Sequence, residues 1–492
     1  MWTTVPGVVA SVALRSATEL TGLLARRELS STELVEEQLR RIEQHNPTLN
    51  AVVVLDADQA RARAAAADAA TAAGRSWGPL HGLPITVKES FDVQGWPTTY
   101  GDPRWRDNVA TTTAEAVQRL LDAGAILVGK TNVPLNLADW QTYNEVYGST
   151  SNPWDLGRTP GGSSGGSAVA LATGMSALEL GSDIGGSIRN PAHCCGVFGH
   201  KPTYGIVSAL GHGLPHLRQP LDINSCGPLA RSAADLRLAL DVLAGPGGRA
   251  GGAWSLQLPP PSFAAVTDLR VAVVLDDPNA RVDAAVQEQI SKAADVLADH
   301  GAHVDRTARP GFDTTEFNDL YVALLRAATA QVADDAFFED STAFAGRADP
   351  DDRSYAARAA RGLTMTHRRW LQLNERRAEL ATAWDAFFDE FDVVLCPAAV
   401  STAFPHDQVG DRNTRTIAVN GVDQLVTDQI FWAGYANLTG LPATVAPVGT
   451  APDGLPVGVQ IVGRPYADST TLAVAQLLER IHRRFTPPPA YA

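Results

Sequence analysis

Cysteine is scarce in this chain. Only Cys194, Cys195, Cys226 and Cys396 are present among 492 residues, too few for a disulfide framework in a protein of this length. Cys194 and Cys195 are adjacent, which is poor geometry for a mutual bridge. No CxxC, HExxH or cysteine–histidine group with zinc spacing occurs. We therefore interpret the four cysteines as reduced core residues and expect no metal site.

Long apolar runs and basic runs are also missing. The sequence contains no stretch of 18 or more apolar residues, so it predicts no membrane-spanning helix. The first residues lack the basic region of a secretory signal. From this we expect a cytoplasmic protein. Lys and Arg number 40 against 54 Asp and Glu, giving a formal net charge of −14. This balance argues against a nucleic-acid-binding face and weakly against anionic membranes.

Apolar residues are plentiful, by contrast. They make up 45% of the chain, ample for a large core, and the length alone suggests about three domains at roughly 150 residues each. Short apolar segments alternate with amphipathic ones, a pattern that predicts an α/β fold around one mixed sheet. The expected strands are 83–88, 126–128, 269–275, 302–304, 393–397, 443–448 and 457–462, the last two forming a hairpin through 452–454.

Capping residues predict where the helices begin and end. Ser31 is expected to cap a helix with apolar periodicity over 33–42, which Asn46 and Pro47 would end. Further helices are expected from Thr18 onward and over 57–73, 113–123 and 282–300. Glycine and proline gather at 245–262, which we interpret as a surface crossing, and the charge-rich, aromatic stretch 310–375 has a helical pattern without a chemical motif.

Two glycine–serine segments, 160–167 and 181–191, flank a small apolar insert at 168–180. A flexible linker would not carry such an insert. A phosphate-binding loop would need a GK[ST] ending or a GxGxxG after a strand, and neither is present. Unobstructed glycine backbone beside a serine favours nucleophilic catalysis, because its N–H groups can stabilise an oxyanion.

The first of these segments also matches the pattern GxSxG, over 161–165 and again shifted by one residue. A nucleophile elbow needs a preceding strand and later Asp and His partners. Thr159 and Pro160 precede this segment instead, and the later histidines lie in no recognisable triad context. We expect these later histidines to be structural residues or surface residues. They are His200, His212, His216, His303, His367 and His406.

Several ordered motifs together resemble the amidase signature family. Lys88 lies in the first motif, at 82–89, and this motif is followed by the glycine–serine loop 161–166 and the loop 183–189. The resemblance runs from about residue 18 to 457–460 and is thinnest over 245–440. His200 is a departure, since many members have an apolar residue there. Supporting matches lie at 129–132, 152–155 and 199–203.

The resemblance implies a single large α/β fold whose central mixed β-sheet is covered by helices on both faces. It implies that Ser187 is the nucleophile, Ser163 a bridging serine and Lys88 the base, with a cis bond between Gly162 and Ser163. No metal or organic cofactor is implied. The oxyanion hole would be formed by the backbone N–H groups of Ile184, Gly185, Gly186 and Ser187.

Such a relay has a physical requirement. A free lysine has a pKa of about 10.4 and is protonated at neutral pH, so Lys88 can act as a base only if burial lowers that pKa. Lys88 follows an apolar strand, which makes burial the expectation. Neutral Lys88 would accept the proton of Ser163, and Ser163 that of Ser187.

Residues near the triad are expected to have supporting or substrate-binding roles. Ser164 is expected to support Lys88, and Asp183 and Arg189 to brace the loop around Ser187. Lys130 is not expected to be the base. The aromatic residues Phe431, Trp432 and Tyr435 are compatible either with a substrate wall or with the core. The expected substrate-binding residues are Leu137, Ala138, Asp139, Trp140 and Gly162.

The function implied is hydrolysis of a small aryl, acylamide or carbamate-like (urethane) amide, with esterase side activity. The alternative is the ammonia-producing component of a glutamine-dependent tRNA amidotransferase, which feeds ammonia to a partner protein; the divergent 310–440 region and residues 1–14 argue mildly against it. A non-catalytic binding protein is disfavoured, because all three triad positions are present. A small-molecule amide is therefore the expected partner, without nucleic acid or membrane, and a homodimer is compatible with the sequence.

The motifs also change the expected domain organisation. Lys88, Ser163 and Ser187 must meet in one core, so one large body replaces the three domains that length suggested. Within it we expect a helical segment over 1–75, a core over 76–245, a variable linker and helical substrate lobe over 246–375, and the rest of the core over 376–492.

Overall fold

A computed structural model describes residues 12–215 and 217–492, so the start of the predicted segment 1–75 and His216 lie outside the described residues. Most strands belong to one sheet. They are β1 (Val52–Leu55), β2 (Pro84–Lys88), β3 (Ile126–Thr131), β6 (Glu179–Asp183), β7 (Phe198–Lys201), β8 (Ser225–Ala230), β9 (Arg270–Val273), β10 (His303–Asp305), β11 (Val393–Pro397), β14 (Ala443–Thr450) and β15 (Pro456–Gly463). The predicted strands are thereby confirmed in type and place.

These eleven strands lie in the order β1-β3-β2-β6-β8-β7-β14-β15-β11-β9-β10. The sheet is mixed: β2 runs parallel to β3 and β6, and β9 runs parallel to β10 and β11, while the other neighbours are antiparallel. The predicted hairpin of β14 and β15 is present. Two small ribbons stand apart, β4 (Tyr143–Asn144) with β5 (Gly148–Ser149) and β12 (Thr416–Val419) with β13 (Val422–Leu425).

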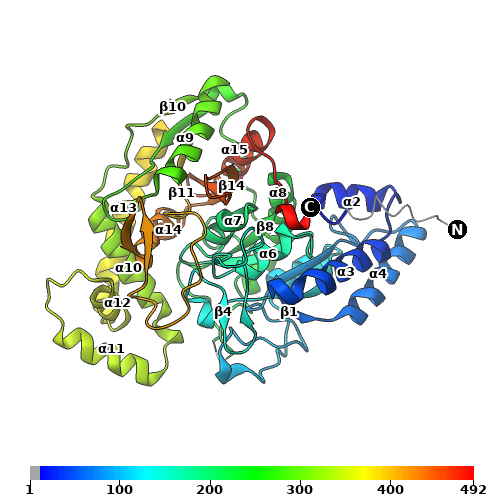
Figure 1. The fold of residues 1–492 in the computed structure, drawn as a ribbon, viewed down its shortest axis with the longest axis horizontal. Helices are drawn as coiled ribbons and strands as arrows, with labels where there is room; N and C mark the ends of the chain where they lie inside the picture. The colour runs from blue at the N-terminus through cyan, green and yellow to red at the C-terminus, as the bar shows by residue number, and fades with distance from the viewer. Residues whose placement is uncertain (1–11, 216) are drawn as a thin grey trace.

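Helices cover this sheet. They are α2 (Ala17–Ala25), α3 (Ser31–Leu49), α4 (Ala57–Ala72), α5 (Glu115–Asp122), α6 (Gly165–Ala172), α7 (Arg189–Cys195), α8 (Ala233–Leu243), α9 (Ala284–Asp299), α10 (Thr314–Thr329), α11 (Asp335–Arg347), α12 (Tyr355–Leu363), α13 (His367–Glu390), α14 (Ile430–Asn437) and α15 (Asp468–Ile481). In Figure 1, α10 to α13 gather at the opposite end of the molecule from α2 to α4. No helix in the described ranges is both long and apolar enough to cross a bilayer.

Successive strand residues enter two different apolar clusters, because side chains alternate between the faces of a sheet. Val445 packs in a cluster with residues of α3, α4, α6 and α7, whereas its neighbour Ala446 packs with α8, α9 and α15. Leu229 and Ala230 divide in the same way. Helices therefore cover both faces, which confirms the predicted fold class.

The limits of α3 differ from the prediction. Ser30, not Ser31, caps the helix: its hydroxyl accepts from the Glu33 N–H over 3.1 Å, and the Glu33 carboxylate accepts from the Ser30 N–H over 2.9 Å. The helix also continues past Pro47 to Leu49. It ends there because the Asn46 side chain accepts from the backbone that follows, including the Val52 N–H at 2.8 Å.

Candidate active site

The topology of the sheet brings two of the sequence motifs together. β2 ends at Lys88, and β6 ends at Asp183, directly before the loop that carries Ser187. Because β2 and β6 are parallel neighbours, their carboxyl ends meet at one edge of the sheet. Ser163 lies at the same edge, two residues before α6.

Lys88 is fully buried between two serines. Its Nζ donates to the Ser163 Oγ over 2.7 Å and to the Ser182 Oγ over 3.0 Å. Burial lowers the pKa of Lys88 to about 7, against the opposing charge of Asp183. The bond between Gly162 and Ser163 is cis. A lysine that loses its proton near neutral pH thus lies within proton-transfer distance of Ser163.

Ser187 is 6% exposed and lines the same cavity as Ser163 and Ser182. Ser164, predicted to support Lys88, points elsewhere: its hydroxyl lies 3.5 Å from the Ser182 carbonyl oxygen, and its N–H donates to the Ser187 carbonyl over 3.1 Å. Ser164 therefore joins the two loops through the backbone, and Ser182, which sequence reasoning missed, is the second serine on Lys88. The run 181–183 carries no local signal for that contact.

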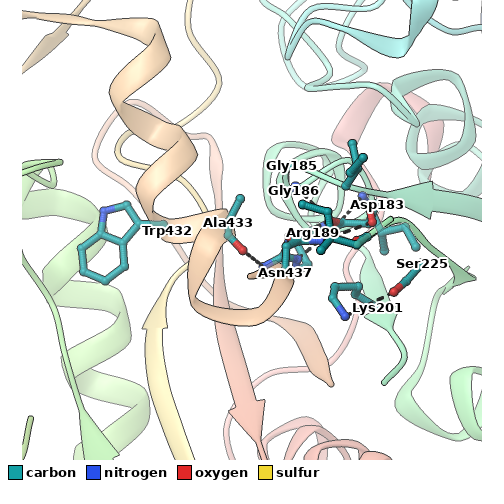
Figure 2. A network of polar contacts seen from close by, with 12 residues as sticks. Asp183, Gly185, Gly186, Arg189, Lys201, Ser225, Trp432, Ala433 and Asn437 are labelled. Atoms are coloured by element: carbon teal, nitrogen blue, oxygen red, sulfur yellow. Dashed lines mark hydrogen bonds and ion pairs between the residues drawn. The ribbon is translucent and has the colours of Figure 1, made fainter. Parts of the chain in front are cut away.

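A buried ion pair braces the loop around Ser187 (Figure 2). The Arg189 Nη2 lies 2.8 Å from the Asp183 Oδ1, and both side chains are almost fully buried. Burial alone would raise the pKa of Asp183, but the guanidinium outweighs it and holds that pKa well below its ordinary value. Arg189 also donates to the Ala433 carbonyl over 3.2 Å and to the side chain of Asn437. The loop is thereby tied to α14, as expected for bracing residues.

One of the predicted oxyanion donors is occupied by this arrangement. The Gly186 N–H donates to the Asp183 Oδ1 over 2.9 Å, so it is not directed at a substrate. The other predicted donors are the N–H groups of Ile184, Gly185 and Ser187. We correct the prediction for Gly186 accordingly: its amide holds the loop to the carboxylate.

Two side chains fix the orientation of two consecutive peptide groups in this loop. The Tyr321 hydroxyl donates to the Ile184 carbonyl over 2.7 Å, and the Trp140 indole donates to the Gly185 carbonyl over 3.0 Å. The C=O and N–H of a planar trans peptide point in opposite directions. Tyr321 therefore sets where the Gly185 N–H points, and Trp140 sets where the Gly186 N–H points.

The cavity beside the serines has a largely apolar wall. The predicted Leu137, Ala138, Asp139 and Trp140 all line it. Gly162 does not; a Cβ there would lie 2.4 Å from the Asp139 carbonyl oxygen, so it serves the close approach of two loops. The other aliphatic lining residues are Ile184, Leu214, Leu221, Leu325, Val332, Val426 and Ile430.

Sequence reasoning missed several polar lining residues. His212, expected to be structural or at the surface, lines the cavity with its Nε2 3.0 Å from the Ser90 Oγ, and burial together with the Lys88 charge lowers its pKa to about 3. Asn224, Arg326 and Arg412 also line it. The arginines come from the 310–440 region, where no motif marks them.

Other candidates have structural surroundings. The Lys130 Nζ donates to the Thr98 Oγ1 over 3.0 Å, and the His200 Nδ1 lies 2.9 Å from the Thr444 Oγ1. His303 and His367 are exposed, and His406 is half-buried. Among the described residues, no group of three His, Cys, Asp or Glu side chains could hold a metal ion. Phe431, Trp432 and Tyr435 are fully buried in the core.

Comparison with known proteins places this geometry in a family. The family described as Amidase matches residues 33–472. The chain is 33% identical to an indoleacetamide hydrolase of Bradyrhizobium diazoefficiens over 94% of this chain and 86% of that protein. It is 35% identical to the A subunit of the glutamyl-tRNA(Gln) amidotransferase of Synechococcus sp. (strain CC9605), over 94% of this chain and 96% of that protein.

A solved structure agrees. A bacterial aryl acylamidase of the amidase signature family superposes with a TM-score of 0.77 at 27% identity, over 96% of this chain and 97% of that one. The fold, the family match across most of the chain and the similar proteins all support the same family. The chain belongs to the amidase signature family of hydrolases, which act on carbon–nitrogen amide bonds.

Proposed function

We propose that this chain is an autonomous amidase that hydrolyses a small aryl, acylamide or carbamate-like amide through an acyl-enzyme on Ser187. The observation that carries the proposal is the 2.7 Å contact between the buried Lys88 Nζ and the Ser163 Oγ, in a site whose cavity also reaches Ser187. Esters would be accepted as well, because the same acyl-enzyme forms from either substrate.

The proposed reaction moves one proton along the relay. Neutral Lys88 takes the proton of the Ser163 hydroxyl while Ser163 takes that of Ser187, whose oxygen then attacks the carbonyl carbon. The oxyanion is stabilised by the N–H groups of Ile184, Gly185 and Ser187. The proton returns through Ser163 to the leaving nitrogen, because an amide anion is a very poor leaving group. Water then hydrolyses the ester on Ser187.

Tyr321 acts in this proposal as a positioning residue. It is fully buried, and its hydroxyl holds the Ile184 carbonyl without lining the cavity. We expect Tyr321→Phe to lower kcat by about tenfold with little change in KM, since a lost hydrogen bond of about 1.4 kcal/mol would act on the oxyanion donor alone. Steady-state kinetics with a chromogenic anilide measure the two constants separately.

Tyr435→Phe is the matched control for that variant. Tyr435 belongs to the same aromatic core, but its hydroxyl is buried without a hydrogen-bond partner. Removing this hydroxyl should leave kcat unchanged. If both variants lower kcat equally, or if Tyr321→Phe raises KM alone, Tyr321 does not position the donor.

The amidotransferase component is the second candidate function, because relatives of that name are 32–35% identical over 94–96% of the chain. Glutamine carries an ammonium group, which a binding site must match with an acceptor. Asp139 is the sole acidic side chain among the described residues that line the cavity, and its Oδ2 lies 2.8 Å from the Arg415 Nη1. That pairing leaves no free carboxylate for the ammonium and favours a substrate other than glutamine.

The two candidates make opposite predictions for the chain purified alone. A panel of an anilide, an alkyl amide, a carbamate, an ester and glutamine should show amine release from at least one of the first three. Ammonia release from glutamine should be far slower. A chain that is inert alone and active on glutamine only with a co-purifying partner would replace our proposal with the amidotransferase function.

A further inference from the structure

Two guanidinium groups on the cavity wall have no carboxylate partner. Arg326, on α10, donates to the hydroxyl of Tyr355, and the Arg412 Nη1 donates to the Ala138 carbonyl over 2.5 Å. Both acceptors are uncharged. Asp139 is already bound to Arg415. Among the described lining residues, Asp139 is the sole acidic side chain, so the two guanidinium groups exceed the acidic charge on the cavity wall.

Donor groups in the same place are also left unused. The Arg326 Nε and the Asn224 Nδ2 are both buried without a hydrogen-bond partner. An unpartnered buried donor costs free energy, and more so when the group is charged. Burial and the nearby charge of Arg326 also lower the pKa of Arg412, and both side chains line the same cavity. An anion between them would relieve both penalties.

Both cations are anchored close to the residues that hold the oxyanion loop. Arg326 follows Tyr321 by five residues on α10, which is about 7.5 Å along the helix axis, and Tyr321 holds the Ile184 carbonyl. Arg412 is bound to Ala138, two residues before Trp140, which holds the Gly185 carbonyl. Arg326 thus shares a helix with one residue that holds the oxyanion loop, and Arg412 is bound beside the other; among the described residues, no hydrogen bond joins either arginine to the loop itself.

We propose that the cavity selects amides that carry a carboxylate on the part of the substrate remote from the scissile bond, with Arg326 and Arg412 as the binding residues. A guanidinium presents a planar fork of donors that matches a carboxylate. Asn224 supplies a further donor. This inference rests on the proposed amidase function, and it names the substrate class for that same cavity.

The test compares matched substrates. Anilides of linear acyl groups, three to six methylenes long, would end in a carboxylate, an isosteric isopropyl group or an ammonium. We expect kcat/KM to be at least about tenfold higher for the carboxylate than for the isopropyl substrate of the best chain length, and lowest for the ammonium substrate. This order is measured on the unaltered enzyme, so no variant has to fold.

Variants then assign the effect to the residues. Arg326→Gln and Arg412→Gln should each lower kcat/KM for the carboxylate substrate about tenfold, mainly through KM, and change it less than about threefold for the isopropyl substrate. Arg281→Gln is the control, since Arg281 is exposed, pairs with Asp276 and lies outside the cavity. Thermal unfolding of each variant checks that it is folded.

Three results would overturn the inference: equal kcat/KM for the carboxylate and isopropyl substrates, an ammonium substrate as good as the carboxylate, or a preference that neither glutamine variant reduces. Any of these leaves the amidase function standing, because an anilide is still hydrolysed. Failure of the proposed function has a different signature, namely no hydrolysis of any anilide by the chain alone.

Discussion

Ser187→Ala is expected to lower kcat/KM for amide hydrolysis by at least about 10⁴-fold, equal to about 5 kcal/mol of transition-state stabilisation. The reason is that no acyl-enzyme can form without the Ser187 oxygen, so only binding and the oxyanion donors would remain. The fold should be unaffected, because a lost hydroxyl on a cavity wall leaves the packing of the loop in place. Amine release, followed with a chromogenic anilide, measures the effect.

Two further variants sharpen this result. Ser76→Ala changes an exposed serine that does not line the cavity and should keep full activity. The double variant Ser163→Ala/Ser187→Ala should be no worse than Ser187→Ala alone, because groups that act as one unit are not additive. Activity within tenfold of the unaltered enzyme in Ser187→Ala would remove that residue from the mechanism.

Lys88→Ala is expected to lower kcat/KM by about 10²–10⁴-fold, the range typical of a lost general base. The unaltered enzyme should lose activity in acid, since only the neutral amine accepts a proton. With a pKa of about 7 for Lys88, kcat/KM should be at its plateau above that pH and fall tenfold for each unit below it, to about 100-fold lower at pH 5. The pH profile of kcat/KM measures this limb.

Burial lowers the pKa of Lys88, and the Asp183 carboxylate is the largest influence that opposes this shift. Lys88→Arg should not restore activity, because a guanidinium stays protonated.

Lys201 has a similarly lowered pKa, about 7, but donates to the carbonyls of Pro202 and Leu441. Lys201→Met should therefore keep the acid limb. An acid limb that disappears in Lys201→Met and persists in Lys88→Ala would assign it to Lys201.

The sequence predicted the centre of the site better than its walls. The motifs around Lys88 and Ser163, through the family that they resemble, implied that these residues lie together, and the structure places the Lys88 Nζ 2.7 Å from the Ser163 Oγ. The apolar strand before Lys88 predicted its burial, which the structure shows. Asp183 and Arg189, which the sequence predicts to brace the loop around Ser187, form an ion pair in the structure.

The sequence did not predict the residues that reach the site through tertiary packing. Tyr321 and Arg326 belong to the stretch 310–375, whose helical pattern contains no chemical motif, and Arg412 lies in the connection between β11 and β12. Nothing in their sequence neighbours shows that they face the cavity. Pro47 shows a related limit: a proline predicts a helix end locally, whereas α3 continues to Leu49 and the Asn50 N–H still donates to the Asn46 carbonyl over 2.7 Å.

The most direct test of the central claim is to find which serine becomes acylated or phosphonylated. A fluorophosphonate probe reacts with an activated serine, and mass spectrometry of the digested protein locates it. No Lys or Arg lies between Arg158 and Arg189, so trypsin leaves Ser163, Ser164 and Ser187 in one peptide, and fragment ions must assign the site. We predict the label on Ser187. A label on Ser163 or Ser164, with Ser187 unmodified, would contradict the account.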